Sequence, residues 1–219
     1  MLVGRQSATT KNHSITGLAH PLALRLLNKQ GTSQPRVLEV GAGSGRNLMT
    51  LLSARLDVTS LDEDAQRVTR LRRKYPELKN NLLCAAYTQL PKVGNGYDAV
   101  LSTHALLHGD VSKIRAVLAE IRRILSSEGN AYFTLGCTAD LRFGEGRKIA
   151  EATFAPTSGD EQGVPHSYFD EAGAHDLLRN FEIEELSQQA VDDIAGKWAH
   201  ETTMLRGAVH WFVVAKKAR

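Results

Sequence analysis

An acid and three alternating glycines lie between an apolar run and a helical pattern, in the segment VLEVGAGSGRNLM at residues 37–49. Glycine lets the backbone approach a ligand closely, because no side chain stands in the way. Ligands of open α/β sheets bind at the carboxyl ends of the strands, where this turn is expected to lie. The segment therefore predicts a cofactor site that includes Glu39, Gly41, Gly43 and Gly45.

Two classes of nucleotide cofactor use turns of this kind. The dinucleotide fingerprint would place its third glycine at position 46, which is Arg46 in this chain. A pyrophosphate has no evident use for Glu39, whereas a carboxylate can bind an amino-acid ammonium group directly or through water. Asp62 follows about twenty residues beyond the glycines, and an acid there can bind both ribose hydroxyls of either cofactor. Arg46 and Glu39 thus favour a cofactor with an amino-acid portion over a nicotinamide dinucleotide.

Apolar runs and helical patterns alternate along the chain, which predicts an α/β fold with a mostly parallel sheet covered on both faces. Helices are expected at 15–31, 46–56, 63–75 and 111–125, the last closed by the turn SSEGN. Strands are expected at 36–40, 57–62, 81–86, 97–102, 131–137, 181–188 and 208–217. The last two strands are expected to pair as an antiparallel hairpin.

The residues between the fifth predicted strand and Phe181 form a long irregular stretch. Loops of this length in compact domains are usually functional or disordered, so we expect residues 138–168 to form a lid over the cofactor and much of an acceptor pocket. Phe143, Phe154 and Tyr168 can exclude water there, and Arg142 is expected to be a solvated loop charge. The predicted organisation is one domain, with an N-terminal helical segment (1–34), a cofactor-binding core (35–137), the lid, and a C-terminal helix with closing strands (169–219).

The motifs EVGAGSG at 39–45, Asp62, LPKVGNGYDAVLSTHALLHGD at 90–110 and IRRILSSEGNAYFTL at 121–135 together resemble those of class I S-adenosylmethionine-dependent methyltransferases. The later segment also resembles a small-molecule group of that superfamily with a tellurite-resistance-like or generic label. The resemblance implies a Rossmann-like, doubly wound, seven-stranded sheet, S-adenosylmethionine as cofactor and S-adenosylhomocysteine as product. The cofactor-binding residues it implies are Glu39, Gly41, Ala42, Gly43, Gly45, Asn47, Asp62, Glu63, Ala86, Tyr87, Ser102 and His104.

One position departs from the family pattern. The loop after the third strand often carries an acid that accepts a hydrogen bond from the adenine amino group, and Ala86 stands there. Loss of one such hydrogen bond costs on the order of 1 kcal/mol, which is not the whole binding energy. Backbone groups at Ala86 and Tyr87 are expected to remain available to the cofactor, with the Tyr87 ring near the adenine.

Histidines follow the fourth strand and end the predicted lid. His108 and His166 are the candidate catalytic residues, facing the acceptor and removing its proton if it arrives protonated; activity would then fall below about pH 6.5. His104 and His108 have a spacing that could place both on one helical face. However, HALLH lacks the glutamate of zinc proteases and no third ligand is evident, so no metal is predicted.

Composition narrows the remaining alternatives. The chain has 219 residues, a formal net charge of +3 and two cysteines, and its apolar runs are too short to cross a bilayer. These features favour a cytoplasmic protein with no membrane partner, and the resemblance implies a small-molecule methyl acceptor. The basic run at 70–79 is expected to be a solvated helix face, and the fourth strand lacks the motif of enzymes that methylate base amino groups. A methyltransferase acting on RNA, DNA or protein, a nicotinamide-dependent oxidoreductase and a non-catalytic cofactor binder are the alternatives, and the oligomeric state is left open.

Overall fold

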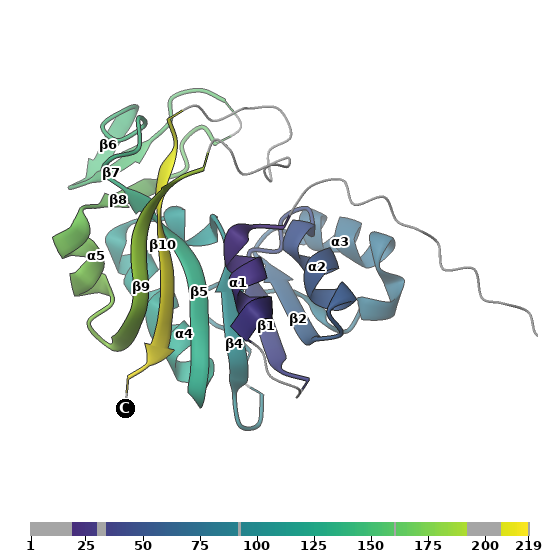
Figure 1. Cartoon of the computed structure of the whole chain (residues 1–219). Helices are drawn as coiled ribbons and strands as arrows, with labels where there is room; N and C mark the ends of the chain where they lie inside the picture. Colours follow the sequence, from purple (N-terminus) through teal and green to yellow (C-terminus); the bar gives the residue numbers. More distant parts are fainter. Residues whose placement is uncertain (1–18, 30–33, 92, 160, 192–206, 219) are drawn as a thin grey trace, which may run out of the picture.

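The computed structural model of the protein describes residues 19–29, 34–91, 93–159, 161–191 and 207–218. Helices and strands alternate as the sequence predicts (Figure 1). The helices are α1 (Pro21–Lys29), α2 (Arg46–Ser53), α3 (Ala65–Lys74), α4 (Val111–Ile124) and α5 (Glu171–Leu177), with short 3₁₀ helices η1 (Pro76–Leu78) and η2 (Ala105–Leu107). The strands are β1 (Arg36–Val40), β2 (Asp57–Asp62), β3 (Leu82–Cys84), β4 (Tyr97–Ser102), β5 (Leu125–Cys137), β6 (Arg147–Ala150), β7 (Thr153–Ala155), β8 (His166–Phe169), β9 (Phe181–Ala190) and β10 (Val209–Lys217).

Seven strands form the predicted Rossmann-like sheet, in the order β3-β2-β1-β4-β5-β10-β9. The strands from β3 to β5 in that order run parallel, while β10 runs antiparallel to both β5 and β9. The expected C-terminal antiparallel hairpin is therefore confirmed. The parallel strands end at one edge of the sheet, the upper edge in Figure 1.

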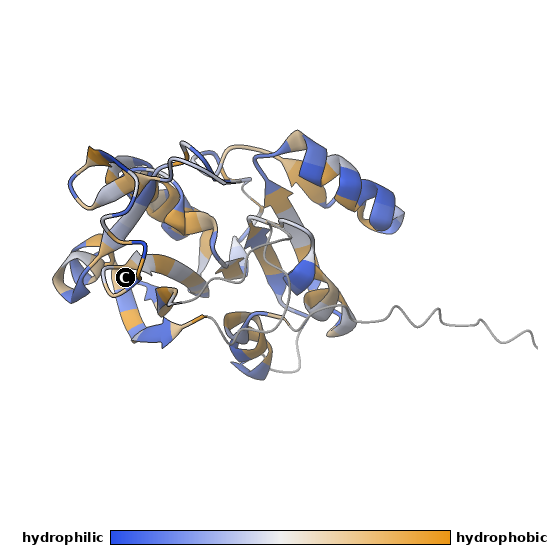
Figure 2. Cartoon of the chain, turned by 90° about the horizontal axis from the view of Figure 1, so that it is seen from above, coloured by the Kyte–Doolittle hydropathy of each residue, from blue (hydrophilic) through white to orange (hydrophobic). Residues whose placement is uncertain are grey.

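Each face of the sheet is covered by a hydrophobic core. On one face, Ile114, Val117, Leu118 and Ile121 of α4 pack with α5 residues against the strands. Their spacing of three and four residues places them on one side of the helix, which is why this segment is helical and amphipathic. On the other face α1, α2 and α3 cover the sheet. Figure 2 shows the hydrophobic residues along the central strands and the hydrophilic ones on outward faces of the helices.

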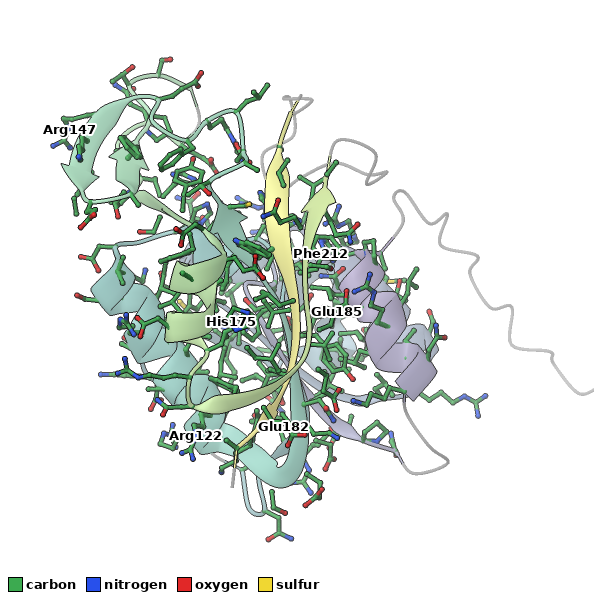
Figure 3. The ribbon with its side chains drawn as sticks, turned by 60° about the vertical axis from the view of Figure 1, so that its left-hand side comes forward. Arg122, Arg147, His175, Glu182, Glu185 and Phe212 are labelled. Carbon is green, nitrogen blue, oxygen red and sulfur yellow. The ribbon has the colours of Figure 1, made fainter. Side chains whose placement is uncertain are left out.

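The helix α1 is held on the sheet by its charged residues as well as by its apolar ones. Arg25 forms an ion pair with Glu185 of β9, and its guanidinium lies 5.7 Å from the ring centre of Phe212 in β10. Figure 3 labels both strand residues, which lie beside α1. The first part of the predicted helix lies outside the described residues, and Ala19 and His20 are not helical. The helix begins at Pro21 because proline suits the first turn and the His20 ring accepts a hydrogen bond from the Leu22 N–H.

Two other expectations are wrong. Residues 126–130, expected as a turn after α4, belong to β5, whose pairing with β4 is irregular between Tyr97 and Ala99. The region expected to be irregular contains three short strands, β6, β7 and β8, which we call the three-stranded extension. These strands pair antiparallel, so much of the backbone in this region is hydrogen-bonded within a sheet.

The three-stranded extension is attached to the main sheet just beyond the end of β4. Its last strand, β8, pairs parallel with β5 through Gly136–Tyr168 and Cys137–Phe169. A side chain at Gly136 would lie 2.2 Å from the Ser167 carbonyl oxygen, so only glycine permits this close pairing. The Trp211 indole N–H donates to the Phe169 carbonyl at 2.8 Å. The extension consequently stands over the carboxyl edge of the sheet (Figure 1). Among the described helices, none is long and apolar enough to span a membrane.

Candidate active site

The glycine turn between β1 and α2 lies at the carboxyl edge of the sheet and packs against η2. Gly41, Gly43 and Gly45 have φ angles of +83°, +54° and +81°, a region that side chains rarely adopt. A Cβ at Gly41 would lie 2.5 Å from the Ala105 Cβ. The protein's own packing thus requires glycine at position 41, and at position 45 a Cβ would likewise lie 2.8 Å from the Leu71 side chain. Because η2 lies against the turn, His104 and His108 at its two ends are brought to the same edge.

Glu39 at the end of β1 is a buried carboxyl group with 1% exposure. The Ser60 hydroxyl donates to its Oε2 at 2.6 Å. Burial raises the pKa of Glu39 from 4.5 to about 7, against the opposing effects of hydrogen bonds and the Arg46 charge. A cationic ligand at this position would therefore find a carboxyl group whose ionisation it can stabilise.

Asp62 ends β2 and holds the glycine turn. Its Oδ2 accepts a hydrogen bond from the Gly43 N–H at 2.9 Å, and its Oδ1 accepts one from the Asp64 N–H at 2.9 Å. A carboxylate oxygen can accept more than one hydrogen bond, so ligand hydroxyls can still be bound. The turn and the acid form one hydrogen-bonded unit at the end of neighbouring strands.

Glu63 and Tyr87 are linked to each other. The Tyr87 N–H donates to Glu63 Oε1 at 2.9 Å, and Lys113 of α4 pairs with Glu63 Oε2 at 3.0 Å. The Ala86 carbonyl accepts a hydrogen bond from the Gln89 N–H at 3.0 Å. The expectation that these two backbone groups remain available is therefore wrong for the Tyr87 N–H. The Tyr87 ring is buried, with its hydroxyl close to Gly41.

Asn47 and Ser102 are buried and hydrogen-bonded within the protein. Asn47 Oδ1 accepts from the His20 N–H at 3.0 Å, and its Nδ2 donates to the Thr103 hydroxyl at 2.9 Å. The Ser102 hydroxyl donates to the Val40 carbonyl at 3.0 Å, joining the ends of β4 and β1. These contacts fix the strand ends and the segment before α1 relative to the glycine turn.

His104 lies in the left-handed region, with φ +66°, and its N–H donates to the Thr134 hydroxyl at 2.8 Å. Its ring centre lies 5.0 Å from those of His20 and His210. Burial lowers the pKa of His104 well below the usual value, with a smaller contribution from neighbouring positive charge. This side chain is thus neutral at physiological pH. Sequence reasoning did not foresee its two histidine neighbours, which come from distant segments.

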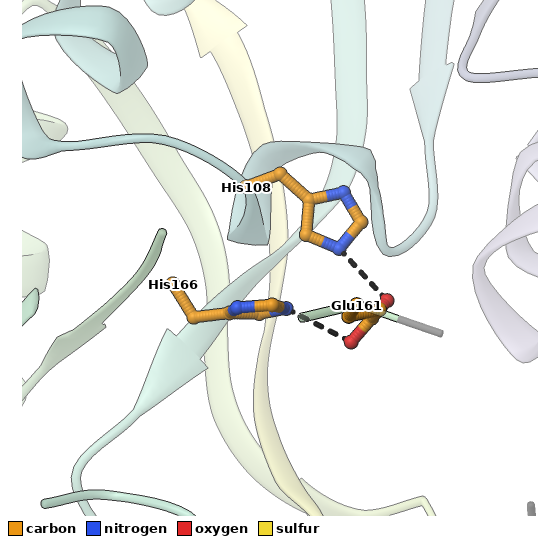
Figure 4. Close-up of side chains that lie close together, drawn as sticks. All are labelled: His108, Glu161 and His166. Carbon is orange, nitrogen blue, oxygen red and sulfur yellow. Dashed lines mark ion pairs between the residues drawn. The ribbon is translucent and has the colours of Figure 1, made fainter. Parts of the chain in front are cut away.

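The structure brings His108 and His166 together, with their ring centres 4.8 Å apart (Figure 4). Glu161 lies between them: its Oε1 is 3.2 Å from His108 Nε2 and its Oε2 is 3.0 Å from His166 Nε2. Burial acts to raise the pKa of Glu161, but the two histidines outweigh it and hold the pKa well below its usual range. Glu161 belongs to no sequence motif, so sequence reasoning missed it. His104, which we paired with His108 by spacing, is not part of this group; the residues beside His108 are Glu161 and His166.

Arg142 is not the solvated loop charge that we expected. It donates twice to the carboxylate of buried Asp140, at 2.8 and 2.7 Å, and the second oxygen of that carboxylate also accepts from the Val209 N–H. The paired charges at Asp140 and Arg142 fix the start of the extension to β10. Phe143, Phe154 and Tyr168 pack on one another, with the first ring 5.6 Å from each of the other two.

Comparison with known proteins agrees with this fold. Residues 37–129 match the family described as "Methyltransferase domain". No curated protein matches the sequence. Similar solved structures include a methyltransferase from Methanosarcina mazei described as SAM-dependent, with a TM-score of 0.71 and 17% identity over 88% of this chain and 96% of that one. TehB from Haemophilus influenzae has a TM-score of 0.62 and 16% identity, over 91% of this chain and 62% of its own.

A third similar structure was solved with ligands. It is the 1,6-didemethyltoxoflavin-N1-methyltransferase from Burkholderia thailandensis, holding 1,6-didemethyltoxoflavin and S-adenosylhomocysteine. It has a TM-score of 0.64 and 17% identity, over 91% of this chain and 77% of its own. The chain thus shares the fold of these methyltransferases, and its residues 37–129 match the methyltransferase-domain family.

Proposed function

We propose that this enzyme transfers the methyl group of S-adenosylmethionine to a small-molecule acceptor bound between the glycine turn and the three-stranded extension. The observation that carries this proposal is the position of His108, Glu161 and His166. Strand β8 and the loop before it bring His166 and Glu161 to His108. His108 directly follows η2, and Ala105, the first residue of η2, packs on Gly41. Polar groups that converge beside a cofactor turn are suited to orient a small acceptor.

The chain's residues fit the cofactor. Glu39 would bind the ammonium group of its amino-acid portion, and Asp62 would bind the ribose hydroxyls. The turn of Gly41, Ala42, Gly43 and Gly45 would pass close to the ligand, with Tyr87 near the adenine. Glu63, Ala86, Asn47, Ser102 and His104 would support this arrangement through the contacts described above. The bound cofactor supplies a methyl group on a sulfonium, which is already an activated electrophile.

Catalysis would then require an oriented acceptor, exclusion of water and, for a protonated acceptor, removal of a proton. His108 and His166 are the residues placed for that last task, with Glu161 holding both rings. Phe143, Phe154 and Tyr168 form an aromatic cluster at the extension, with Tyr168 buried and Phe143 40% exposed, and this cluster is suited to exclude water from a bound acceptor. We propose that residues 138–168 close over the bound acceptor as a unit, because their strands are paired with one another.

Two observations support a small acceptor over a macromolecule. The toxoflavin methyltransferase, which shares this fold, was crystallised with a small heterocyclic acceptor. In addition, the basic run on α3 is partly engaged by the protein, since Arg72 donates twice to the Leu82 carbonyl. One guanidinium group of this run is therefore held against the protein itself, which limits its contact with a nucleic acid.

The test is a reaction of the purified enzyme with a methyl-labelled donor and a pooled metabolite extract. We expect label in the low-molecular-mass fraction, dependent on enzyme. As a control, Gly43→Val should abolish cofactor binding and all labelling, because a branched side chain is strained at φ +54° and obstructs the ligand. Label found only in added RNA or protein, with a strongly salt-dependent association for RNA, would contradict a small-molecule acceptor.

A further inference from the structure

The group of His108, Glu161 and His166 has the composition of a metal site as well as that of a proton-transfer site. One ligand atom from each residue, an imidazole nitrogen from each histidine and a carboxylate oxygen from Glu161, lies within 4.8 Å of the other two. They come from three separate places: the end of η2, the loop before β8 and the first residue of β8. Figure 4 shows both rings presenting a nitrogen to the same carboxylate.

The second ring nitrogen of His166 supports metal binding. His166 Nδ1 lies 2.9 Å from the Val164 carbonyl oxygen, and a carbonyl can only accept, so Nδ1 carries the hydrogen. In the neutral ring, Nε2 therefore points a lone pair at Glu161 Oε2, 3.0 Å away. Two lone pairs repel at this distance unless a proton or a cation lies between them. A backbone carbonyl that accepts from the far nitrogen is also the usual partner of a metal-ligating histidine.

We propose that His108, Glu161 and His166 bind one divalent transition-metal ion, with zinc as the best fit to two imidazoles and a carboxylate. A tetrahedral zinc site needs ligand atoms roughly 3.4 Å apart, which small side-chain rotations can reach from the observed arrangement. The side chains of His108 and Glu161 are 31% and 26% exposed, so one side of the ion would be open. Three protein ligands with an open position are typical of a catalytic ion, not of a structural one.

The role of this ion rests on the proposed function. In the open position it would bind an oxygen or nitrogen atom of the acceptor and lower the pKa of that atom, so that its proton passes to water. The lone pair left on that atom would attack the methyl carbon, whose bond to sulfur breaks to release S-adenosylhomocysteine. With the ion bound, both histidines would be its ligands, and the ion would take the place of a histidine base. Binding of one ion by all three side chains would explain why Glu161 lies between the two rings.

The metal can be tested without knowing the acceptor. Untagged protein, stripped with a chelator, is titrated with zinc by calorimetry and with cobalt, whose visible absorption reports the coordination. We expect one equivalent to bind, and Glu161→Gln and His166→Gln to weaken binding at least about 100-fold, since loss of an outer partner alone costs 10–100-fold. Matched controls are Glu145→Gln, in the extension, and His175→Gln, in α5; both residues are exposed and should leave affinity unchanged.

S-adenosylhomocysteine affinity, measured on the same samples, separates the two proposals. Unchanged cofactor affinity in Glu161→Gln, with metal binding lost, supports the metal site. If wild type and Glu161→Gln bind zinc equally, or if both controls weaken it as much, the metal site is overturned whatever the acceptor proves to be. Equal zinc binding together with a lower melting temperature for Glu161→Gln would show that the three side chains form ion pairs that stabilise the fold and do not bind the metal.

Discussion

At the scale of single residues, the buried carboxyl group of Glu39, which we propose binds the cofactor, should lower the stability of the folded chain at neutral pH. Its carboxyl group ionises near pH 4.5 in the unfolded chain but only near about pH 7 in the folded one. Unfolding therefore releases a proton between these values, and stability falls as the pH rises through this window. Above about pH 7 the full cost is present, on the order of 1–3 kcal/mol.

Glu39→Gln should remove this cost while keeping a hydrogen-bond acceptor for Ser60. We expect the free energy of unfolding to rise by about 1–3 kcal/mol at pH 8 and to change little near pH 4.5. The same variant should bind S-adenosylhomocysteine more weakly, because the ammonium group loses its anionic partner. Denaturant unfolding at both pH values and calorimetry measure the two effects.

The exposed Glu77 provides a matched control, since Glu77→Gln removes the same charge from η1, outside the site. The free energy of unfolding of Glu77→Gln, relative to wild type, should be about the same at pH 8 as near pH 4.5. A Glu39→Gln protein that is no more stable at pH 8, or that binds the product as tightly as wild type, would show that Glu39 does not have this role.

At the scale of elements, the contact between the glycine turn and η2 joins the cofactor site to the histidines. Gly41→Ala would add a methyl group 2.5 Å from the Ala105 Cβ, at a φ of +83°. We expect it to lower the free energy of unfolding by about 1–3 kcal/mol through strain and overpacking. Ala105→Gly removes the opposing methyl group, so the double variant should recover part of this loss, with a coupling of about 1 kcal/mol.

Recovery should be incomplete because Ala105→Gly leaves the backbone strain at position 41. Denaturant unfolding of the wild type, the two single variants and the double variant provides the coupling directly. Strictly additive losses would mean that the turn and η2 do not pack as described, and that His108 is not held beside the cofactor turn in this way.

At the scale of the whole molecule, cofactor binding should stabilise the fold, because Glu39, the glycine turn and Asp62 come from adjoining strand ends. At one hundred times its dissociation constant, S-adenosylhomocysteine should add about 2.7 kcal/mol of stability. NAD(H) should add much less, since Arg46 occupies the place of the third glycine of the dinucleotide fingerprint. Thermal melts with each ligand make the comparison.

No shift with millimolar S-adenosylhomocysteine, with a clear shift for NAD(H), would contradict the assignment of the cofactor. Asp62→Ala is a useful companion variant, because it should reduce the ligand-induced shift. Its own melting temperature must be compared without ligand, since Asp62 also accepts the Gly43 N–H.

The sequence by itself determined the central α/β sheet and the glycine turn, and it predicts the class of cofactor. These features depend on short-range patterns: apolar strand runs, the helical spacing in α4, and an acid with three glycines within seven residues. The C-terminal hairpin was predictable for the same reason, since two apolar strands without a resolved helix between them favour antiparallel pairing. The length of β5 and the start of α1 were not predictable from the sequence, because the ends of strands and helices depend on strand pairing and helix capping.

Only the tertiary structure decided the arrangement beyond the sheet. The three-stranded extension has short strands with weak alternation, and its attachment to β5 depends on the absence of a side chain at Gly136, where the Ser167 carbonyl approaches. Glu161 belongs to no motif, yet chain folding places it between two histidines that are 58 residues apart in sequence. Residues that are distant in sequence and meet only in the folded chain leave no periodic pattern in the sequence.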